Sequence, residues 1–417
     1  MTAFFDDLER RDPQAREADL FARLPAFLEA ARRETPGLDR WLDGVDAAAL
    51  TSRAALAQLP VLRKAELMEM QAKEPPFGGF AAPAHVNGGR IFMSPGPIWE
   101  PQGLAADPAQ AARAFFAAGV RPGDVVHNAF SYHMTPGGFM LDHGARALGC
   151  AVFPAGTGNT EMQVEAAAAL RPSVYAGTPD FLKAILDRAG EMGRDLSSIR
   201  LGLVSGGALF PSLRAEYLSR GVRVYQCYAT AEFGVIAYES AGEDGAPNPG
   251  LLVNENLIIE IVRPGTGDPV AEGEVGELVV TSLNPAKPLV RLGTGDLSAI
   301  MPGRSPCGRT AARIAGWLGR ADQRTKVKGM FVDPKHVAEI VARHPGIARA
   351  RLVVTRDGAR DAMALHVEPA AGGTLDTAAI EASLREITKL GGAVHQAAPG
   401  SLANDGKIIA DERDYAG

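Results

Sequence analysis

The sequence predicts an α/β protein with a large N-terminal domain and a small, mobile α+β C-terminal domain. From residue 120 to residue 228, short apolar runs recur roughly every 20 to 28 residues, which leaves room for one helix and its loops, so we expect parallel strands joined by crossover helices. After Pro249 the apolar runs are split by glycine and proline, a pattern that indicates a barrel-like β subdomain. Two helical and two strand patterns complete the chain. The expected domains are residues 1–321 and 322–417.

The N-terminal region and the first sheet can be assigned from periodicity. Residues 1 to about 75 are predicted to be helical, because apolar side chains between Leu20 and Leu28 recur at helical spacing. Ligands of parallel sheets bind beyond the carboxyl ends of the strands, and two glycine-rich turns, residues 155–158 and 205–207, fall there. The expected parallel strands lie at residues 124–130, 150–154, 173–177, 201–205 and 222–226.

The later elements follow from the same patterns. Strands are expected at residues 257–262 and 276–280 in the barrel-like part. A helix from residue 334 to residue 341 opens the small domain, and a second helix is expected over Thr377–Thr388. Between these helices lie two strand patterns, at residues 351–355 and 363–367.

Composition excludes several classes of protein. The chain is 46% hydrophobic and 22% charged, as in an ordinary globular protein. The net charge of −6 and the lack of any basic run argue against nucleic-acid binding. Three scattered cysteines are too few for a disulfide framework, so a reducing, cytoplasmic location is expected. No apolar stretch approaches the ~20 residues of a membrane span, and the acidic N-terminus lacks the charge pattern of a signal peptide.

Three segments that lie far apart in the chain complete one pattern. Residues 228–234 (YATAEFG) follow an apolar run, residues 291–296 (RLGTGD) precede residues 319–322 (GRAD), and Gly406-Lys407 lies near the C-terminus. In this order they resemble the core motifs of the adenylate-forming enzymes. Over nearly the whole chain the resemblance is strongest to the phenylacetate–CoA ligase branch. It implies an enzyme that activates a carboxylic acid with ATP as an acyl-AMP and then passes the acyl group to a thiol.

The resemblance assigns roles to five residues of these segments. Lys407 matches the lysine that bridges carboxylate and phosphate during adenylation, where charge must be stabilised. Glu232 matches the magnesium-binding acid, and Tyr228 matches the aromatic that lies against adenine. Asp296 matches the acid that holds the ribose hydroxyls, and Arg291 offers a cation for the phosphate. Taken singly, Lys407 reads as a solvated tail residue and Asp296 as part of an ordinary turn.

Further residues are assigned by the same resemblance. Asp322 matches the hinge about which the small domain swings, and a hinge residue must absorb a large backbone rotation. Tyr132, His133 and Gly137 are candidates for the acyl pocket, although a lone histidine near a strand end is more often structural. The loops expected to contact nucleotide or CoA contribute Ser205, Gly206, Gly207, Ala229, Thr230, Lys328 and Gly329.

One segment departs from the resemblance. Where relatives carry a Ser/Thr/Gly-rich phosphate loop ending in lysine, residues 93–101 read MSPGPIWEP. Proline has no N–H to donate and Glu100 is negative, so we do not expect this segment to bind the β- and γ-phosphates. Instead it is expected to form one side of the nucleotide site, with Trp99 as an apolar contact. Pyrophosphate would then be held by magnesium and Arg291, and Glu100→Ala would leave ATP affinity unchanged or tighter.

A second departure concerns zinc. Some relatives hold a structural zinc ion, and the matching positions here are Ser240, Leu252, Ser305 and Cys307. A single thiolate cannot complete a tetrahedral zinc site, so no zinc is expected.

The sequence therefore predicts an AMP-forming acid–CoA ligase that uses ATP, magnesium and CoA on an aryl, arylacetic or small hydroxy acid. The resemblance also implies a homodimer. Two alternatives stay open: a catalytically impaired homologue that binds nucleotide or acyl-CoA, and an adenylating enzyme whose acceptor is a carrier-protein thiol. A dehydrogenase is disfavoured, because the sequence has no Gly-x-Gly-x-x-Gly pattern, and a Gly-x-x-x-x-Gly-Lys-Ser/Thr loop is likewise absent from it.

Overall fold

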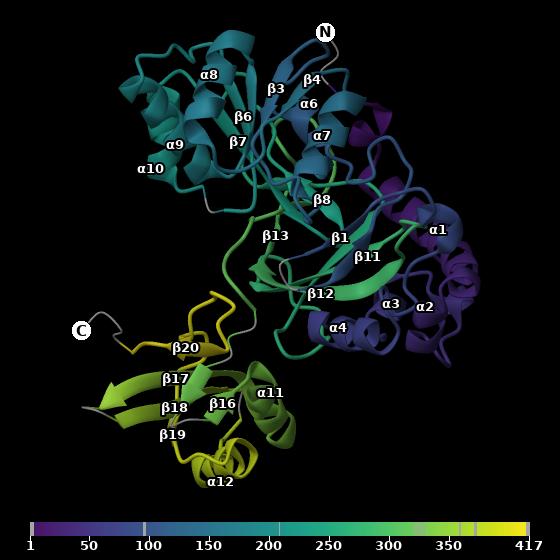
Figure 1. Ribbon diagram of the computed structural model, residues 1–417. Helices are drawn as coiled ribbons and strands as arrows, with labels where there is room; N and C mark the ends of the chain where they lie inside the picture. Colours follow the sequence, from purple (N-terminus) through teal and green to yellow (C-terminus); the bar gives the residue numbers. More distant parts are fainter. Residues whose placement is uncertain are drawn as a thin grey trace.

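A mixed sheet of nine strands forms the centre of the large N-terminal part of the computed structural model (Figure 1). The structure describes residues 4–94, 97–207, 209–321, 323, 325–327, 330–357, 360–370 and 373–413. Five neighbouring strands are parallel, and four more extend the sheet in antiparallel fashion, in the order β13-β14-β9-β8-β7-β6-β5-β3-β4. Their bounds are β3 (Val125–Asn128), β4 (Ala151–Pro154), β5 (Val174–Gly177), β6 (Leu201–Val204), β7 (Arg223–Thr230), β8 (Gly234–Tyr238), β9 (Leu251–Val253), β13 (Ile300–Met301) and β14 (Arg313–Ile314).

Helices connect the successive parallel strands, so the predicted crossover arrangement is confirmed. In α9, Leu182, Ile185 and Ala189 recur at spacings of three and four residues and share a buried cluster with Tyr175 of β5. Pro179 at the start of this helix presets the helical backbone angle. The connecting helices are α7 (Gly137–Ala147), α8 (Thr160–Leu170), α9 (Pro179–Glu191) and α10 (Pro211–Ser219), and α6 (Ala112–Ala117) precedes β3.

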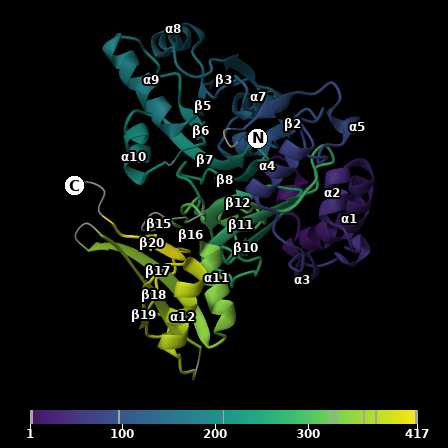
Figure 2. The same cartoon turned by 60° about the horizontal axis from the view of Figure 1, so that its bottom comes forward.

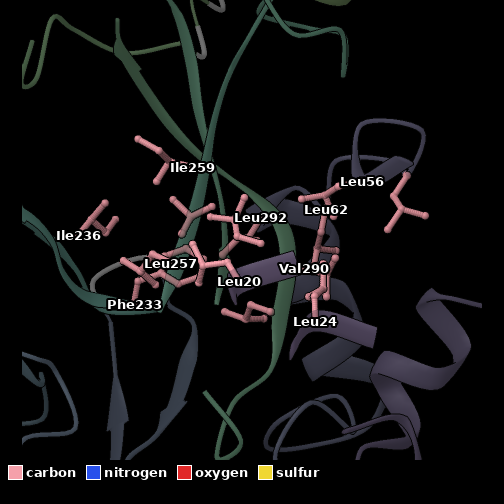
Figure 3. Close-up of a cluster of buried hydrophobic side chains, with 14 of the residues drawn as sticks. Leu20, Leu24, Leu56, Leu62, Phe233, Ile236, Leu257, Ile259, Val290 and Leu292 are labelled. Atoms are coloured by element: carbon pink, nitrogen blue, oxygen red, sulfur yellow. The ribbon is translucent and has the colours of Figure 1, made fainter. Parts of the chain in front are cut away.

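The N-terminal helical region packs on a second, antiparallel sheet of order β10-β11-β12. Figure 3 shows Leu20 and Leu24 of α1 in one buried cluster with Leu257 and Leu292 of that sheet, and each such leucine contributes roughly 1.5–3 kcal/mol by burial. The two strands predicted after Pro249, at residues 257–262 and 276–280, are β10 and β11 of this sheet, whereas β9, β13 and β14, which were not predicted, join the large sheet. The bounds are η1 (Asp7–Arg10), α1 (Pro13–Glu34), α2 (Pro36–Trp41), η2 (Ala47–Ala49), α3 (Arg53–Leu56), α4 (Lys64–Lys73), α5 (Pro83–Val86), β1 (Ile91–Met93), β2 (Trp99–Pro101), β10 (Leu257–Val262), β11 (Gly276–Ser282) and β12 (Leu289–Ser298).

The C-terminal part of the chain forms a separate unit, which lies at one end of the molecule in both views (Figures 1 and 2). Its sheet has the order β19-β18-β17-β20, and its own core includes Val337, Ile340, Ile380 and Leu384 from two helices. The predicted helix Thr377–Thr388 coincides with α12. The bounds are β15 (Thr325–Val327), β16 (Met330–Val332), α11 (Pro334–Arg343), β17 (Ile347–Asp357), β18 (Arg360–Pro369), α12 (Thr377–Thr388), β19 (Ala393–Gln396) and β20 (Ile409–Asp411). Within the described ranges, no helix has both the length and the apolar character needed to cross a membrane.

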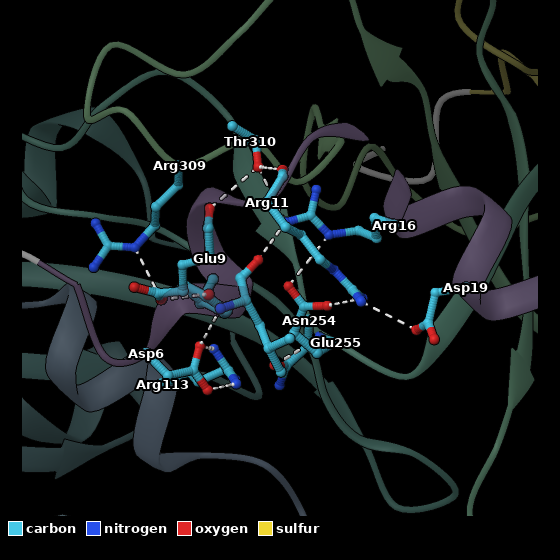
Figure 4. A network of polar contacts seen from close by, with 12 residues as sticks. Asp6, Glu9, Arg11, Arg16, Asp19, Arg113, Asn254, Glu255, Arg309 and Thr310 are labelled. Atoms are coloured by element: carbon cyan, nitrogen blue, oxygen red, sulfur yellow. Dashed lines mark hydrogen bonds and ion pairs between the residues drawn. The ribbon is translucent and has the colours of Figure 1, made fainter. Parts of the chain in front are cut away.

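Charged side chains hold the N-terminal segment against the large sheet (Figure 4). Arg113 of α6 donates to both carboxylate oxygens of Asp6, and Arg309 Nε lies 2.9 Å from Glu9 Oε1. Glu9 and Arg309 are both buried. Because removing one member of a buried ion pair leaves an uncompensated charge, this pair fixes the position of the loop that contains residues 305–310.

Candidate functional site

Strands β7 and β12 bring two of the predicted nucleotide-binding residues into contact. The Tyr228 hydroxyl donates a hydrogen bond of 2.6 Å to Asp296 Oδ2. Burial raises the pKa of the Tyr228 phenol well above its usual value, and the Asp296 carboxylate raises it further, so the phenol keeps its proton and acts as a donor. Two motifs that are distant in the sequence therefore meet in space.

Asp296 also accepts hydrogen bonds from the segment that leads into the small domain. Trp317 Nε1 lies 3.1 Å and Arg320 Nη1 lies 3.0 Å from Asp296 Oδ1. A backbone hydrogen bond from Leu297 to Gly319 holds this segment beside β12. Trp317 is 53% exposed, so its ring borders the open side of the carboxylate. Trp317 was not predicted as a site residue, because a lone tryptophan before a Gly-Arg pair carries no chemical signal.

Glu232 lies in the turn between β7 and β8, with its side chain buried and Oε1 2.8 Å from Lys64 Nζ. The Thr230 hydroxyl, at the end of β7, is buried without a hydrogen-bond partner among the described residues. Ala229 precedes it on the same strand. Carboxylate and hydroxyl oxygens are ligands that Mg²⁺ accepts alongside phosphate and water, so the side chains at this turn fit a magnesium ion. Lys64 was missed by the sequence analysis.

The turn at residues 205–207 lies at the carboxyl end of β6, next to β7. The buried Ser205 hydroxyl donates a hydrogen bond of 2.7 Å to the carbonyl oxygen of Cys227. Gly206 has a φ of +71°, which favours glycine, and a Cβ atom there would lie 3.6 Å from the Phe130 ring. The turn therefore lies between β7 and the segment that follows β3.

The three residues predicted for the acyl pocket differ in their surroundings. The Tyr132 hydroxyl donates a hydrogen bond of 3.1 Å to Asp142 Oδ2, and burial raises the pKa of this phenol. A Cβ atom at Gly137 would lie 3.6 Å from the Phe130 ring. His133 is exposed. The Tyr132 hydroxyl is thus bound within the protein, and Phe130 is the side chain that links this segment to the turn at residues 205–207.

Arg291 does not reach the site, and its predicted role as a phosphate cation is wrong. Its guanidinium is fully buried, with Nε 2.9 Å and Nη2 3.0 Å from the Glu260 carboxylate. Its Nη1 donates to the carbonyl oxygens of Ala57 and Leu59. Asp296 has different partners, Tyr228, Trp317 and Arg320, so the two charged residues of β12 share no described contact.

Replacing Arg291 by alanine is therefore expected to destabilise the fold. The change leaves the Glu260 carboxylate, whose pKa is already raised by burial, without its partner. Removing one member of a buried ion pair costs about 3–5 kcal/mol. Unfolding in guanidinium chloride measures this cost, and the double variant Arg291→Met, Glu260→Gln should recover a large part of it. A loss of ATP affinity with unchanged unfolding free energy would contradict this account.

Glu100 also points into the protein, not toward a phosphate. It is buried on β2 and forms an ion pair with the equally buried Lys287. Burial lowers the pKa of the Lys287 ammonium well below its usual value, and the nearby charge of Lys64 lowers it further. The expectation that Glu100→Ala leaves ATP affinity unchanged or tighter thus rests on a wrong premise, because that change would mainly leave Lys287 unpaired. Trp99, the predicted apolar contact, is 40% exposed.

Lys407 lies in the small domain, away from the nucleotide-site residues. Its side chain is exposed and makes no ion pair within the described part of the chain. It lines a cavity of about 240 Å³ together with residues of α11 and with Arg263 and its neighbours in the connection between β10 and β11. Tyr228, Glu232 and Asp296 do not line this cavity. Asp322, Lys328 and Gly329 lie outside the described residues, so their roles stay predictions.

The four positions expected not to hold zinc have other partners. Leu252 belongs to a buried hydrophobic cluster, and Ser240 Oγ accepts a hydrogen bond of 3.1 Å from Asn248 Nδ2. Ser305 Oγ lies 3.1 Å from Cys307 Sγ. One thiol, two hydroxyls and an alkyl chain do not fit tetrahedral zinc, and the described residues contain no other group of three His, Cys, Asp or Glu side chains placed to hold a metal ion. The lack of zinc stays a prediction that metal analysis of the purified protein would check.

Comparisons with known proteins agree in pointing to one family. Residues 149–288 match the family described as AMP-binding enzyme. The chain is 30% identical over 340 residues to the phenylacetate-coenzyme A ligase of Aromatoleum evansii, covering 78% of this chain and 74% of that protein. It is 31% identical over 378 residues to the phenylacetate-coenzyme A ligase of Thermus thermophilus, covering 87% and 83%. Among solved structures, 2-hydroxyisobutyryl-CoA ligase in complex with 2-HIB-AMP and CoA is similar with a TM-score of 0.70 and 25% identity, over 99% of this chain and 93% of that chain.

Proposed function

Since the chain belongs to the phenylacetate–CoA ligase family of AMP-forming acid–CoA ligases, we propose that it activates an aryl, arylacetic or small hydroxy acid at the site around Tyr228, Glu232 and Asp296. The reaction consumes the acid, ATP and CoA and yields acyl-CoA, AMP and pyrophosphate through an acyl-adenylate. The observation that carries the proposed site is the contact between Tyr228 and Asp296, because it joins two motifs of one nucleotide-binding pattern.

Asp296 is proposed to hold the ribose. A carboxylate has about four acceptor positions, and the Asp296 oxygens accept from Tyr228, Trp317 and Arg320. One ribose hydroxyl would donate to the acceptor position that is still free. The second would replace Trp317 or Arg320 as a donor to Oδ1. Hydrogen bonds to an ionised acceptor are about twice as strong as neutral ones, so this exchange can fix the nucleotide. The Tyr228 ring would supply the apolar surface for adenine.

Magnesium is proposed to bind at Glu232. One carboxylate oxygen is 2.8 Å from Lys64 Nζ, and the second has no partner among the described residues. Mg²⁺ is commonly held by one or two carboxylates together with phosphate oxygens and water, so one carboxylate is sufficient, and the buried Thr230 hydroxyl, which has no described hydrogen-bond partner, is a second candidate ligand. When bound, the ion would neutralise charge on the phosphates.

Aromatic side chains favour an aromatic acid. The rings of Tyr132 and Phe139 pack edge to face, with centroids 5.1 Å apart, and the Phe92 and Phe139 centroids are 5.4 Å apart. Phe130 lies between this cluster and the turn at residues 205–207. Aromatic pairs prefer such edge or offset geometries, so this group would contact the ring of an aryl or arylacetic acid favourably. A small hydroxy acid is the second choice, suggested by the name of the solved structure described above.

A substrate panel tests the proposal. Aryl, arylacetic and hydroxy acids would each be combined with ATP, Mg²⁺ and CoA, and the release of AMP would be followed. We expect acid-dependent AMP release to be fastest with an aromatic acid. ADP as the product, or no acid-dependent turnover with any member, would count against the proposal. ATP–pyrophosphate exchange distinguishes the proposed ligase from a catalytically impaired homologue, which would bind AMP without catalysing exchange. Replacing CoA by a phosphopantetheinyl carrier protein tests whether a carrier-protein thiol is the acceptor. Sedimentation would test the expected homodimer.

A further inference from the structure

Three described amides of the segment that replaces the phosphate loop are engaged within the protein. Ser94 N donates to the carbonyl oxygen of Ile98, and Ile98 N donates to Ser94 Oγ. Trp99 N donates to Gln71 Oε1. Pro97, within the same turn, has no N–H. The described amides at these positions are therefore engaged within the protein.

The cation that a phosphate loop would supply is also absent from this segment. Residues 93–101, which stand where relatives carry the loop that ends in lysine, contain no lysine or arginine, and the carboxylate of Glu100 is neutralised by Lys287. Both side chains are buried, 2% and 4% exposed, so neither charge is open to a ligand. Any cation that meets the phosphates must come from another element.

Lys64 is the cation that the fold places next to Glu232. It is the first residue of α4, its side chain is 33% exposed, and it lies 2.8 Å from a carboxylate that is only 3% exposed. The segment before it is fixed to the strand that carries Asp296, since Leu62 N donates to the carbonyl oxygen of Arg291 and Gly293 N donates to that of Leu62, both at 2.9 Å. The backbone bonds to β12 and the ion pair with Glu232 therefore orient the ammonium before a ligand arrives.

We propose that Lys64 binds the β- and γ-phosphates of ATP and takes the place of the missing phosphate-loop lysine. This inference rests on the proposed function. In the first half-reaction a carboxylate oxygen of the acid attacks the α-phosphorus, the bond from that phosphorus to the bridging oxygen breaks, and pyrophosphate leaves with the electron pair. The Lys64 ammonium stabilises the negative charge that grows on the leaving group and transfers no proton. Glu232 holds the ammonium through one oxygen and keeps the other for magnesium.

The test compares Lys64→Gln and Lys64→Arg with Lys73→Ala, which changes an exposed lysine at the other end of the same helix. Glutamine keeps a hydrogen-bond donor for Glu232 but removes the charge. We expect Lys64→Gln to weaken ATP and pyrophosphate binding about tenfold or more and ATP–pyrophosphate exchange about 100-fold, while AMP affinity changes less than about twofold. Lys64→Arg should recover part of both losses, and Lys73→Ala should match the unaltered protein. Calorimetry and isotope exchange provide the measurements.

The outcomes separate this inference from the proposed function. Full ATP binding and exchange in Lys64→Gln would show that Lys64 only supports Glu232, and so would equal losses of ATP and AMP affinity. Either result overturns the inference without affecting the ligase activity of the unaltered protein. Binding of ATP, AMP and pyrophosphate can be measured without turnover. If no acid in the substrate panel were activated, the proposed function would be overturned. A selective loss of ATP binding in Lys64→Gln would still support the role of Lys64.

Discussion

Lys407→Ala is expected to slow acyl-adenylate formation about 10²- to 10³-fold while leaving thioester formation from supplied acyl-adenylate within a few-fold of the unaltered protein. In the first half-reaction a carboxylate must approach the α-phosphate before pyrophosphate leaves, and a cation that contacts both groups at that moment lowers this barrier. The predicted swing about Asp322 would take Lys407 away from the reacting atoms before the second half-reaction, in which the thiol displaces AMP.

The position of Lys407 gives this prediction a structural condition. The exposed side chain lines the cavity beside α11, so the small domain must rotate before Lys407 can reach the α-phosphate. Few described hydrogen bonds oppose such a rotation: Asn404 Nδ2 donates to the carbonyl oxygen of Gly273, and Val275 N donates to Asn404 Oδ1. A small polar contact of this kind is consistent with relative domain motion.

Single-turnover assays of each half-reaction measure the effect of Lys407→Ala. Lys335→Ala is the matched control, since Lys335 is an exposed lysine of the same small domain. It should leave both half-reactions within about twofold, as is usual for an exposed side chain outside a site. Equal losses in both half-reactions of Lys407→Ala would show that Lys407 supports the fold or the domain contact and has no selective role in adenylation.

The fold could be predicted because its elements have strong local periodicity. The parallel strands are short, nearly continuous apolar runs, and the helices between them have an apolar face. The pairing of strands after residue 249 could not be predicted, since β9, β13 and β14 join the large sheet while β10 to β12 form their own. Local pattern specifies an element, but the choice of partner is a long-range property of the packed chain.

The candidate site divides in the same way. Motif resemblance identified Tyr228 and Asp296, and the structure places them in contact. It also suggested Arg291, whose buried side chain is neutralised by Glu260. The direction of a charged side chain depends on local backbone irregularities and on a partner from elsewhere in the chain, and neither is visible in the charge itself.

Lys64 and Trp317 escaped prediction for a related reason. Lys64 contacts the Glu232 carboxylate, and Trp317 contacts the Asp296 carboxylate. Neither residue belongs to the motif that contains the carboxylate it contacts. Lys64 reads as one of several charged residues at the start of a helix, and Trp317 as an isolated aromatic in a loop. Lys64 is brought to the site by the backbone bridge between Leu62 and Leu292 of β12. Trp317 is brought there by the backbone bridge between Arg320 and Asp296.

Asp296→Asn is expected to weaken AMP and ATP binding alike, by about 10- to 100-fold. The change keeps the size of the side chain but replaces one acceptor oxygen by an amide and removes the charge that strengthens the remaining hydrogen bonds. Loss of one hydrogen bond to a charged acceptor, worth about 1.5–3 kcal/mol, accounts for an effect of this size. Because both nucleotides share the ribose, the losses should be equal, in contrast to the selective loss of ATP affinity expected for Lys64→Gln.

Trp317 provides a direct optical measurement of this prediction. Its indole N–H donates to the carboxylate that ribose is proposed to approach, and the ring is half-exposed, so nucleotide binding should change its fluorescence. The sequence contains two other tryptophans, Trp41 and Trp99, and Trp317→Phe identifies their share of the signal. Tyr228→Phe keeps the aromatic ring and removes only the hydroxyl, so it should weaken AMP binding much less than Asp296→Asn does. If Asp296→Asn binds AMP with unchanged affinity and shows the same fluorescence change, the ribose lies elsewhere and the contact between β7 and β12 serves only to join the two strands.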